Sequence, residues 1–399
     1  MHAPSFTGLL VVAIIALGAP LLVGLFPRIR VPAVVLEILA GIAVGPSGFG
    51  WVDVDVPIQI VSLIGLAFLL FLAGLEIDVS RLRGAVLRSA GLGYVVTLAL
   101  GVAVGMVFLA IDWVQSPLLV AIALSATSLG LIVPVLKDAA QVDQPVGRLT
   151  IAGATVADFA AVLLLSLLFS ETSGSTGSRL LLLGLFLVLA ALTVLALTRL
   201  ERSARLEMVL VKLQDTTAEI RVRFAVVLLI AFVAMAGTLG LETILGAFLA
   251  GAILGMVDRD TMTHPNFHLK LEAIGYGFVI PVFFVSSGLR FDLEALLDAP
   301  SALVRVPLFL LALLVVRAVP AALYAPSVGR RRAVAAGLLQ ATSLPFLVTA
   351  TSIGVTLGEI TPVTAAALVS AGLLSVVVFP LVAVTLLRPT AEEVPAPAG

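Results

Sequence analysis

The chain has 399 residues, of which 61% are hydrophobic and only 12% are charged. Soluble domains carry roughly 25% charged residues, so this composition excludes an ordinary soluble protein and indicates an all-α polytopic membrane protein. The sequence contains no cysteine and three histidines, which excludes disulfides and thiolate metal sites. The net charge of −1 gives no reason to expect a nucleic-acid partner, and we expect neither a metal site nor a cofactor.

Thirteen apolar segments approach the length of about 20 residues that a transmembrane helix needs. The first follows no basic region and meets no small-residue cleavage site, so we interpret it as a span and not as a signal peptide. The short second and ninth segments could instead be re-entrant. The predicted spans are 6–26, 31–45, 57–76, 85–111, 116–136, 146–170, 178–198, 222–239, 241–257, 272–288, 301–324, 331–355 and 362–387.

The distribution of basic residues tests this count, because cytoplasmic loops collect Lys and Arg. Alternate connections, starting with the first and including the C-terminal end, hold 19 of the 23 Lys and Arg residues. The other connections hold only Arg179, Arg290 and Arg305. The pattern predicts an N-terminus outside the cell and a cytoplasmic C-terminus.

Four short stretches of the first half recur in the second half, in the same order. Each pair links one span to the seventh span after it, and because seven is odd, the two copies have opposite orientations in the membrane. This predicts one transmembrane transporter domain over 1–399, with inverted six-helix repeats at 6–170 and 222–387, a linker helix at 178–198 and a short cytoplasmic tail at 388–399. The paired stretches are Leu39–Gly41 with Leu249–Gly251, Ile64–Gly65 with Ile274–Gly275, Gly74–Asp78 with Gly288–Asp292, and Ala126–Leu129 with Ala341–Leu344.

The last of these pairs predicts two interrupted helices. Thr127 and Ser128 interrupt the fifth span, and Thr342, Ser343 and Pro345 interrupt the twelfth. Proline removes a helical hydrogen bond, and freed carbonyl groups and half-helix dipoles can face an ion. The alternative is a simple proline kink in each span, but the matched positions favour a substrate site near the middle of the membrane.

Three ionisable side chains lie deep within predicted spans: Asp158, Glu37 and Arg317. Such groups are costly in a membrane and point to function. A carboxylate whose charged form is disfavoured by burial and favoured by a nearby cation can exchange a proton for a metal ion, and Asp158 is the candidate for this role. Arg317 stays protonated and is interpreted as a counter-charge to a carboxylate, Asp158 or Glu37. The alternative is that all three form packing ion pairs or face a water-filled crevice without a role in transport.

Four motifs of small and apolar residues stand out along the chain: Val31–Ser47, Leu69–Asp78, Leu245–Gly251 and Ile280–Leu289. They resemble signatures of the monovalent cation/proton antiporters of the sodium/hydrogen exchanger superfamily.

The resemblance implies a core domain with two crossed, unwound helices, a separate dimerisation domain, and competition between a cation and a proton for an aspartate on the sixth span. It places that aspartate at Asp158, the hydroxyls of the unwound helix at Thr127 and Ser128, and the basic residue of the eleventh span at Arg317. It also implies a homodimer, formed through the first and the seventh to ninth spans.

The chain departs from the family pattern at two positions. Ala157 stands where many members carry Asp, Asn or Gln, and Pro345 stands where some relatives carry a glutamate. One strong carboxylate therefore remains at the expected site, which favours electroneutral one-for-one exchange. The loss of a side-chain ligand at Ala157 leaves the choice between sodium and potassium open. We expect no cytosolic nucleotide-binding domain after the Pro-rich tail.

Three functions are compatible with these features. The first is a secondary antiporter of the cell membrane that exchanges Na⁺ or K⁺ for H⁺ by alternating access. The second is a ligand-gated potassium efflux pathway, and the third is a Na⁺- or H⁺-coupled organic anion transporter of the same fold. We expect no enzymatic activity, because no nucleophile, base and phosphate-binding loop occur together.

Overall fold

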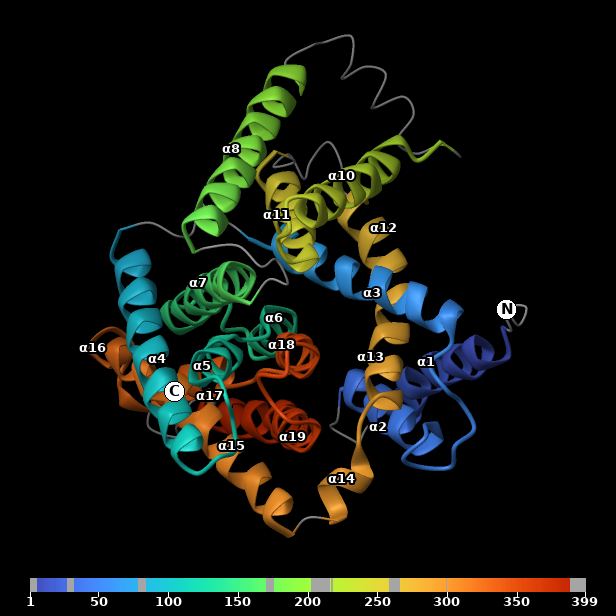
Figure 1. Cartoon of the computed structure of the whole chain (residues 1–399). Helices are drawn as coiled ribbons and strands as arrows, with labels where there is room; N and C mark the ends of the chain where they lie inside the picture. The colour runs from blue at the N-terminus through green and yellow to red at the C-terminus, as the bar shows by residue number, and fades with distance from the viewer. Residues whose placement is uncertain are drawn as a thin grey trace, which may run out of the picture. The chain divides into compact units, whose positions relative to one another are not determined.

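The computed structural model describes residues 6–26, 32–77, 84–169, 176–201, 216, 218–257, 266–298 and 300–387. All regular secondary structure in these ranges is helical (Figure 1). Apolar composition explains this, since only helices satisfy every backbone polar group within one segment in lipid. The predicted cytoplasmic tail 388–399 lies outside the described residues.

Within the described ranges, nine helices are long and apolar enough to cross a membrane, and one bent helix pair makes a tenth. Three further apolar helices are shorter, among them α2 (Ala33–Val44) and α11 (Thr243–Val257), which correspond to the short second and ninth predicted spans. Where it is described, each of the thirteen predicted segments falls on one helix or on consecutive helices, and the chain is a multi-pass membrane protein. The number of complete crossings stays a prediction.

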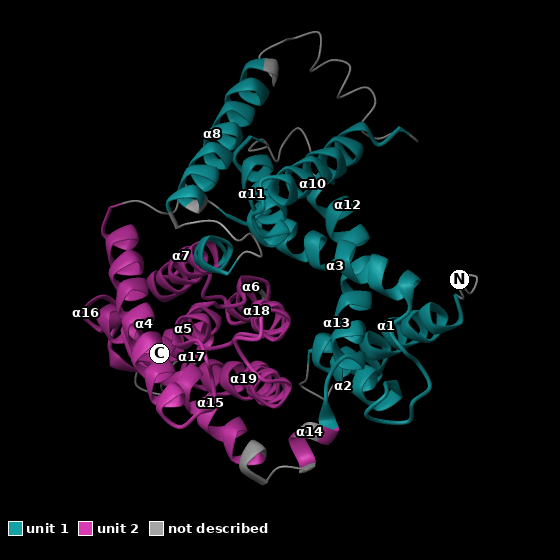
Figure 2. Ribbon diagram, in the orientation of Figure 1, with its two compact units in different colours: residues 1–79, 162–293 teal, residues 80–161, 294–399 magenta. Residues whose placement is uncertain are grey.

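The chain divides into two compact units, each made of two separate stretches of sequence (Figure 2). Unit 1 comprises residues 1–79 and 162–293, and unit 2 comprises residues 80–161 and 294–399. Each unit therefore combines parts of both predicted repeats. Besides α2 and α11, unit 1 contains α1 (Thr7–Leu25), α3 (Val56–Leu75), α8 (Thr176–Glu201), α10 (Ile220–Thr238), α12 (Phe267–Ile274), the π-helix η1 (Gly275–Val279) and α13 (Ile280–Leu289).

Unit 2 contains the remaining helices and both predicted interruptions. Helix α7 (Pro145–Leu168) begins in unit 2 and passes into unit 1 after residue 161. The other elements of unit 2 are α4 (Gly84–Ala110), α5 (Pro117–Ser125), α6 (Leu129–Asp138), α14 (Leu293–Asp298), α15 (Pro300–Ala318), the 3₁₀ helix η2 (Pro320–Tyr324), α16 (Ala325–Val328), α17 (Arg330–Gln340), α18 (Pro345–Thr356) and α19 (Pro362–Leu387).

Glycines allow two pairs of helices in unit 1 to cross with their backbones in contact. On α2, a Cβ atom at Gly41 would collide with the carbonyl oxygen of Val285 on α13. On α11, a Cβ atom at Gly251 would collide with the carbonyl oxygen of Phe71 on α3. Small residues at such crossings let membrane helices approach closely. Gly41 and Gly251 are 210 positions apart, and Phe71 and Val285 are 214 apart.

The glycines on the other helix of each crossing, α3 and α13, make equivalent close contacts. A Cβ atom at Gly74 would collide with the carbonyl oxygen of Phe248, and one at Gly288 would collide with that of Ile38. The offsets are again 214 for the glycines and 210 for their partners. Contacts between α2 and α13 thus recur between α11 and α3 at the offsets found in the sequence, which supports the predicted repeat. The opposite membrane orientation of the copies stays a prediction.

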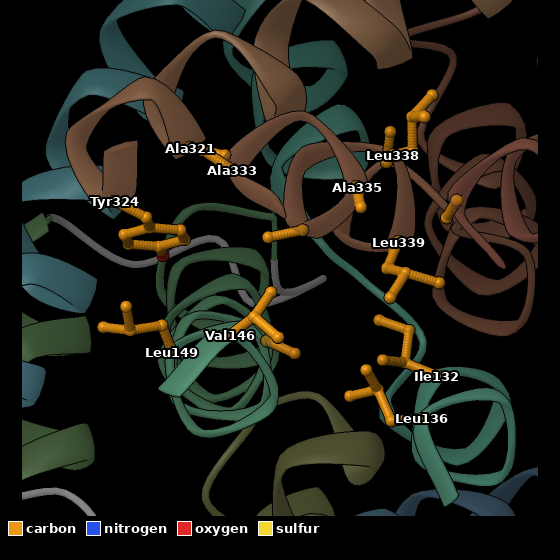
Figure 3. Packing of buried hydrophobic residues seen from close by; sticks show 14 of the residues in the cluster. Ile132, Leu136, Val146, Leu149, Ala321, Tyr324, Ala333, Ala335, Leu338 and Leu339 are labelled. Atoms are coloured by element: carbon orange, nitrogen blue, oxygen red, sulfur yellow. The ribbon is translucent and has the colours of Figure 1, made fainter. Parts of the chain in front are cut away.

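Buried apolar side chains hold five elements of unit 2 together (Figure 3). They come from α6, α7, η2, α17 and α19, and most are alanine, leucine, isoleucine or valine. This packing fixes α7, which carries Asp158, against α17, which ends at the second interruption. The residues labelled in Figure 3 are Ile132, Leu136, Val146, Leu149, Ala321, Tyr324, Ala333, Ala335, Leu338 and Leu339.

Candidate functional site

The first predicted interruption separates α5 from α6. Helix α5 ends at Ser125, the backbone is extended at Ala126 and at Ser128, and α6 begins at Leu129. Thr127 lies in the middle of this break, and it is 2% exposed. The three residues leave free backbone groups on both sides, because the end of a helix has unpaired carbonyls and the start has unpaired amides.

The second interruption separates α17 from α18, and the two helices meet at an angle of 45°. Helix α17 ends at Gln340, and α18 begins at Pro345. Pro345 therefore occupies the first turn of a new helix, where its missing N–H costs no hydrogen bond. Thr342 and Ser343 lie in the break and are fully buried.

The two breaks are joined directly within unit 2. The amide of Ser128 donates a hydrogen bond of 3.1 Å to the carbonyl oxygen of Thr342. The hydroxyl of Thr127 donates a bond of 2.9 Å to the carbonyl oxygen of Gln340. The structure thus brings together the Ala-Thr-Ser-Leu stretches that the sequence pairs across 215 positions.

Asp158 extends from α7 to the first break. Its Oδ1 atom accepts a hydrogen bond of 2.9 Å from the amide of Thr127, and the amide of Leu129, the first residue of α6, also donates to this carboxylate. The carboxylate therefore caps the start of α6, where the helix dipole favours negative charge. Asp158 remains partly accessible, whereas Ala157 beside it is fully buried. The alanine at position 157 offers no side-chain ligand beside the carboxylate.

Arg317 on α15 lies on the other side of Thr127. The side chain is 2% exposed, and its Nη2 atom donates to the hydroxyl of Thr127. Its Nε atom donates to the carbonyl oxygen of Gln340 over 3.1 Å, and its Nη1 atom donates to the hydroxyl of Thr97 over 3.4 Å. The positive charge of Arg317 interacts electrostatically with Asp158. Which carboxylate is the functional counter-charge of Arg317 stays a prediction.

Glu37, the other predicted counter-charge, belongs to unit 1. It lies on α2 and is 5% exposed. Arg317 belongs to unit 2. The structure does not bring Glu37 to the breaks within one unit, and its role stays a prediction.

Two residues at the breaks were not identified from the sequence. Gln340 contacts Thr127 and Arg317 through its main chain, although it lies among apolar and small residues at the end of α17. Ser375 on α19 accepts a bond of 3.2 Å from the amide of Ser343, as Asp158 accepts one from Thr127. A polar residue within an apolar helix is the available signal for both.

The hydroxyl of Ser343 lies in the second break and is fully buried. Its Oγ atom makes no hydrogen bond to any described residue. Buried polar groups are nearly always satisfied, so the hydrogen bonds of the second break leave this hydroxyl unexplained.

Paired interrupted membrane helices with an ionisable side chain at their free ends are typical of secondary transporters. The chain belongs to the sodium/hydrogen exchanger family: the model of that family, described as the transmembrane part of the sodium/hydrogen exchanger, matches residues 13–388. The resemblance found in the sequence is thereby confirmed.

Two bacterial relatives illustrate the similarity. The chain is 32% identical over 371 residues to the putative Na⁺/H⁺ antiporter YjbQ of Bacillus subtilis, which covers 89% of this chain and 58% of that protein. It is 32% identical over 269 residues to a Na⁺/H⁺ antiporter of Enterococcus hirae, with 66% of this chain and 68% of that protein covered. The match therefore spans less than two thirds of the length of the Bacillus subtilis protein.

A solved structure supports the fold. The sodium proton antiporter MjNhaP1 from Methanocaldococcus jannaschii superimposes with a TM-score of 0.61 at 17% identity, covering 96% of this chain and 99% of that chain. This likeness confirms an antiporter-like, all-helical fold for the present chain.

Proposed function

We propose that the protein is a secondary antiporter of the cell membrane that exchanges a monovalent cation, Na⁺ or K⁺, for H⁺ by alternating access. The observation that carries this proposal is the contact between Asp158 and Thr127. It sets the carboxylate at the free ends of an interrupted helix, with Arg317 on the far side of the threonine. The relatives named as Na⁺/H⁺ antiporters support the same reaction class.

Asp158 binds either a proton or a cation in this mechanism. Two backbone amides and the charge of Arg317 stabilise the carboxylate when it is ionised, and burial in an apolar helix bundle opposes the bare charge. A cation or a proton then neutralises it. The hydroxyls of Ser128 and Ser343 and the carbonyl groups of the breaks are the candidate ligands for the cation, since hard monovalent cations are bound by oxygen atoms. Arg317 remains charged throughout and holds Thr127 in place.

Purified protein in liposomes with a trapped pH-sensitive dye tests this function. Addition of Na⁺ or K⁺ outside should make the lumen more alkaline, because each cation that enters sends a proton out. Choline chloride at the same concentration is the control. Absence of a response to Na⁺, K⁺ and Li⁺ alike would contradict cation/proton exchange. Cation flux without proton movement would instead indicate an efflux pathway, and uptake of a labelled organic anion would indicate the third function.

A further inference from the structure

We propose that Gln340 is a positioning residue that sets the geometry of cation binding at Asp158 without touching the cation. This inference rests on the proposed exchange function. It follows from four hydrogen bonds of one residue, 3% exposed, that reach three elements and the first break within unit 2.

The side chain of Gln340 is anchored to α7 and to η2. Its Nε2 atom donates to the carbonyl oxygen of Thr150 over 3.3 Å and to the hydroxyl of Tyr324 over 3.2 Å. Thr150 lies eight residues before Asp158 on the same helix. The amide group of Gln340 therefore has a fixed position relative to the helix that carries the carboxylate.

The main chain of Gln340 is anchored to the opposite side of the site. Gln340 is the last residue of α17, so its carbonyl group has no partner within the helix. This oxygen accepts from the Thr127 hydroxyl over 2.9 Å and from the Arg317 Nε atom over 3.1 Å. One residue thus ties Thr127, whose amide holds Asp158, to the helix from which Asp158 extends.

Gly153 on α7 makes the arrangement possible. A Cβ atom at this position would collide with the Nε2 atom of Gln340 and would lie 2.6 Å from the hydroxyl oxygen of Tyr324. Glycine inside a helix is unfavourable relative to alanine. Its presence is explained by the space that the Gln340 side chain needs to reach α7.

Loss of this anchor should weaken cation binding more than it slows transport. Without the Nε2 bonds, α17 can shift relative to α7, and Thr127 and Arg317 move with the Gln340 carbonyl. The distances from Asp158 to Thr127 and to Arg317 would then no longer be fixed. A residue that only stabilised the fold would lower the amount of folded protein and leave the apparent affinity of that protein unchanged.

Exchange kinetics of Gln340→Leu in liposomes test the proposal. We expect the KM for the cation to rise by about tenfold, with a much smaller change in the maximal rate per folded protein, because lost positioning weakens ground-state binding. Thr150→Val is the matched control. It removes a fully buried hydroxyl that bonds only to the carbonyl oxygen of Val146, and it leaves the Thr150 carbonyl in place.

Tyr324→Phe provides a second variant that removes one of the two Nε2 partners and keeps the ring. It should raise the KM in the same direction by a smaller factor, and adding it to Gln340→Leu should produce no further rise, since both act through one network. If Gln340→Leu does not fold, the KM of Tyr324→Phe for the cation tests the proposal by itself. An unchanged KM in the folded variants, or an equal rise in Thr150→Val, would overturn the proposal. Failure of the wild-type protein to exchange any cation would instead refute the proposed function.

Discussion

The amide of Thr127 donates a hydrogen bond of 2.9 Å to the carboxylate of Asp158. The hydroxyl of the same threonine accepts a bond from Arg317 and donates one to the carbonyl oxygen of Gln340. Thr127 therefore contacts the carboxylate of Asp158 through its main chain and the guanidinium group of Arg317 through its side chain. A shift of Arg317 would move Thr127 and, with it, the amide that bonds to Asp158.

Replacement of the Thr127 hydroxyl separates these two roles. Thr127→Val keeps the amide bond to Asp158 but deprives Arg317 and Gln340 of a shared partner, which costs about 1–3 kcal/mol when buried donors or acceptors are left unsatisfied. We expect a lower thermal unfolding temperature and a higher KM for the cation. Thr127→Ser retains the hydroxyl and should behave much like the wild type. Equal effects of the two substitutions would show that the hydroxyl is unimportant.

Both the positive charge and the guanidinium geometry of Arg317 should be needed for stability and exchange. Arg317→Gln removes the positive charge that acts on Asp158 and breaks the buried guanidinium bonds, and each buried acceptor left unsatisfied costs about 1–3 kcal/mol. Arg317→Lys keeps the charge but cannot bond Thr127, Thr97 and the Gln340 carbonyl together. Thermal unfolding in detergent should rank the proteins as wild type, Arg317→Lys and Arg317→Gln in order of decreasing stability. A stable, fully active Arg317→Gln protein would remove Arg317 from the site.

The helix crossings of unit 1 predict equal effects at two distant glycines. Gly41→Ala and Gly251→Ala each force a Cβ atom against a backbone carbonyl, and overpacking typically costs about 1–3 kcal/mol. Both should lower the thermal unfolding temperature by similar amounts. Gly184→Ala on α8 is the control, because a Cβ atom there meets no other atom within 4 Å. A clear effect at only one of the two sites would argue against equivalent crossings.

The predicted helices and breaks depended on local signals, which explains why the sequence located them. Apolar runs mark spans, and the paired Ala-Thr-Ser-Leu stretches mark the interruptions, which the structure has at 126–128 and 341–344. Asp158 was identified because a charge is rare in such a run.

The hydrogen bonds that connect the residues of the site could not be predicted from the sequence. The carbonyl oxygen of Gln340 accepts hydrogen bonds from Thr127 and Arg317, which are 213 and 23 positions away. Because every residue has a main-chain carbonyl, the residue type does not indicate such a contact. The family resemblance implied a core domain and a separate dimerisation domain, but local patterns could not assign residues to the two units, since each unit combines two distant stretches. Glu37 shows the same limit: a deep charge is visible in the sequence, but its partner is not.

A single carboxylate at the breaks predicts exchange that is independent of membrane potential. Ser375 is neutral and contacts the second break as Asp158 contacts the first. One cation would then replace one proton, and no net charge would cross. The initial rate of Na⁺/H⁺ exchange should be the same with and without an imposed potential, although moving one net charge changes the free energy by about 2.3 kcal/mol per 100 mV. A rate that rises steeply with the potential would indicate a second exchangeable charge.

In the proposed mechanism, a cation and a proton compete for Asp158. Proton release on addition of Na⁺ or K⁺ to purified protein in weakly buffered detergent solution measures this competition without any transport step. Wild-type protein should release protons on cation binding, Asp158→Asn should release none, and Asp143→Asn, which alters an exposed carboxylate in the loop before α7, should match the wild type. Equal proton release from Asp158→Asn and the wild type would contradict the mechanism.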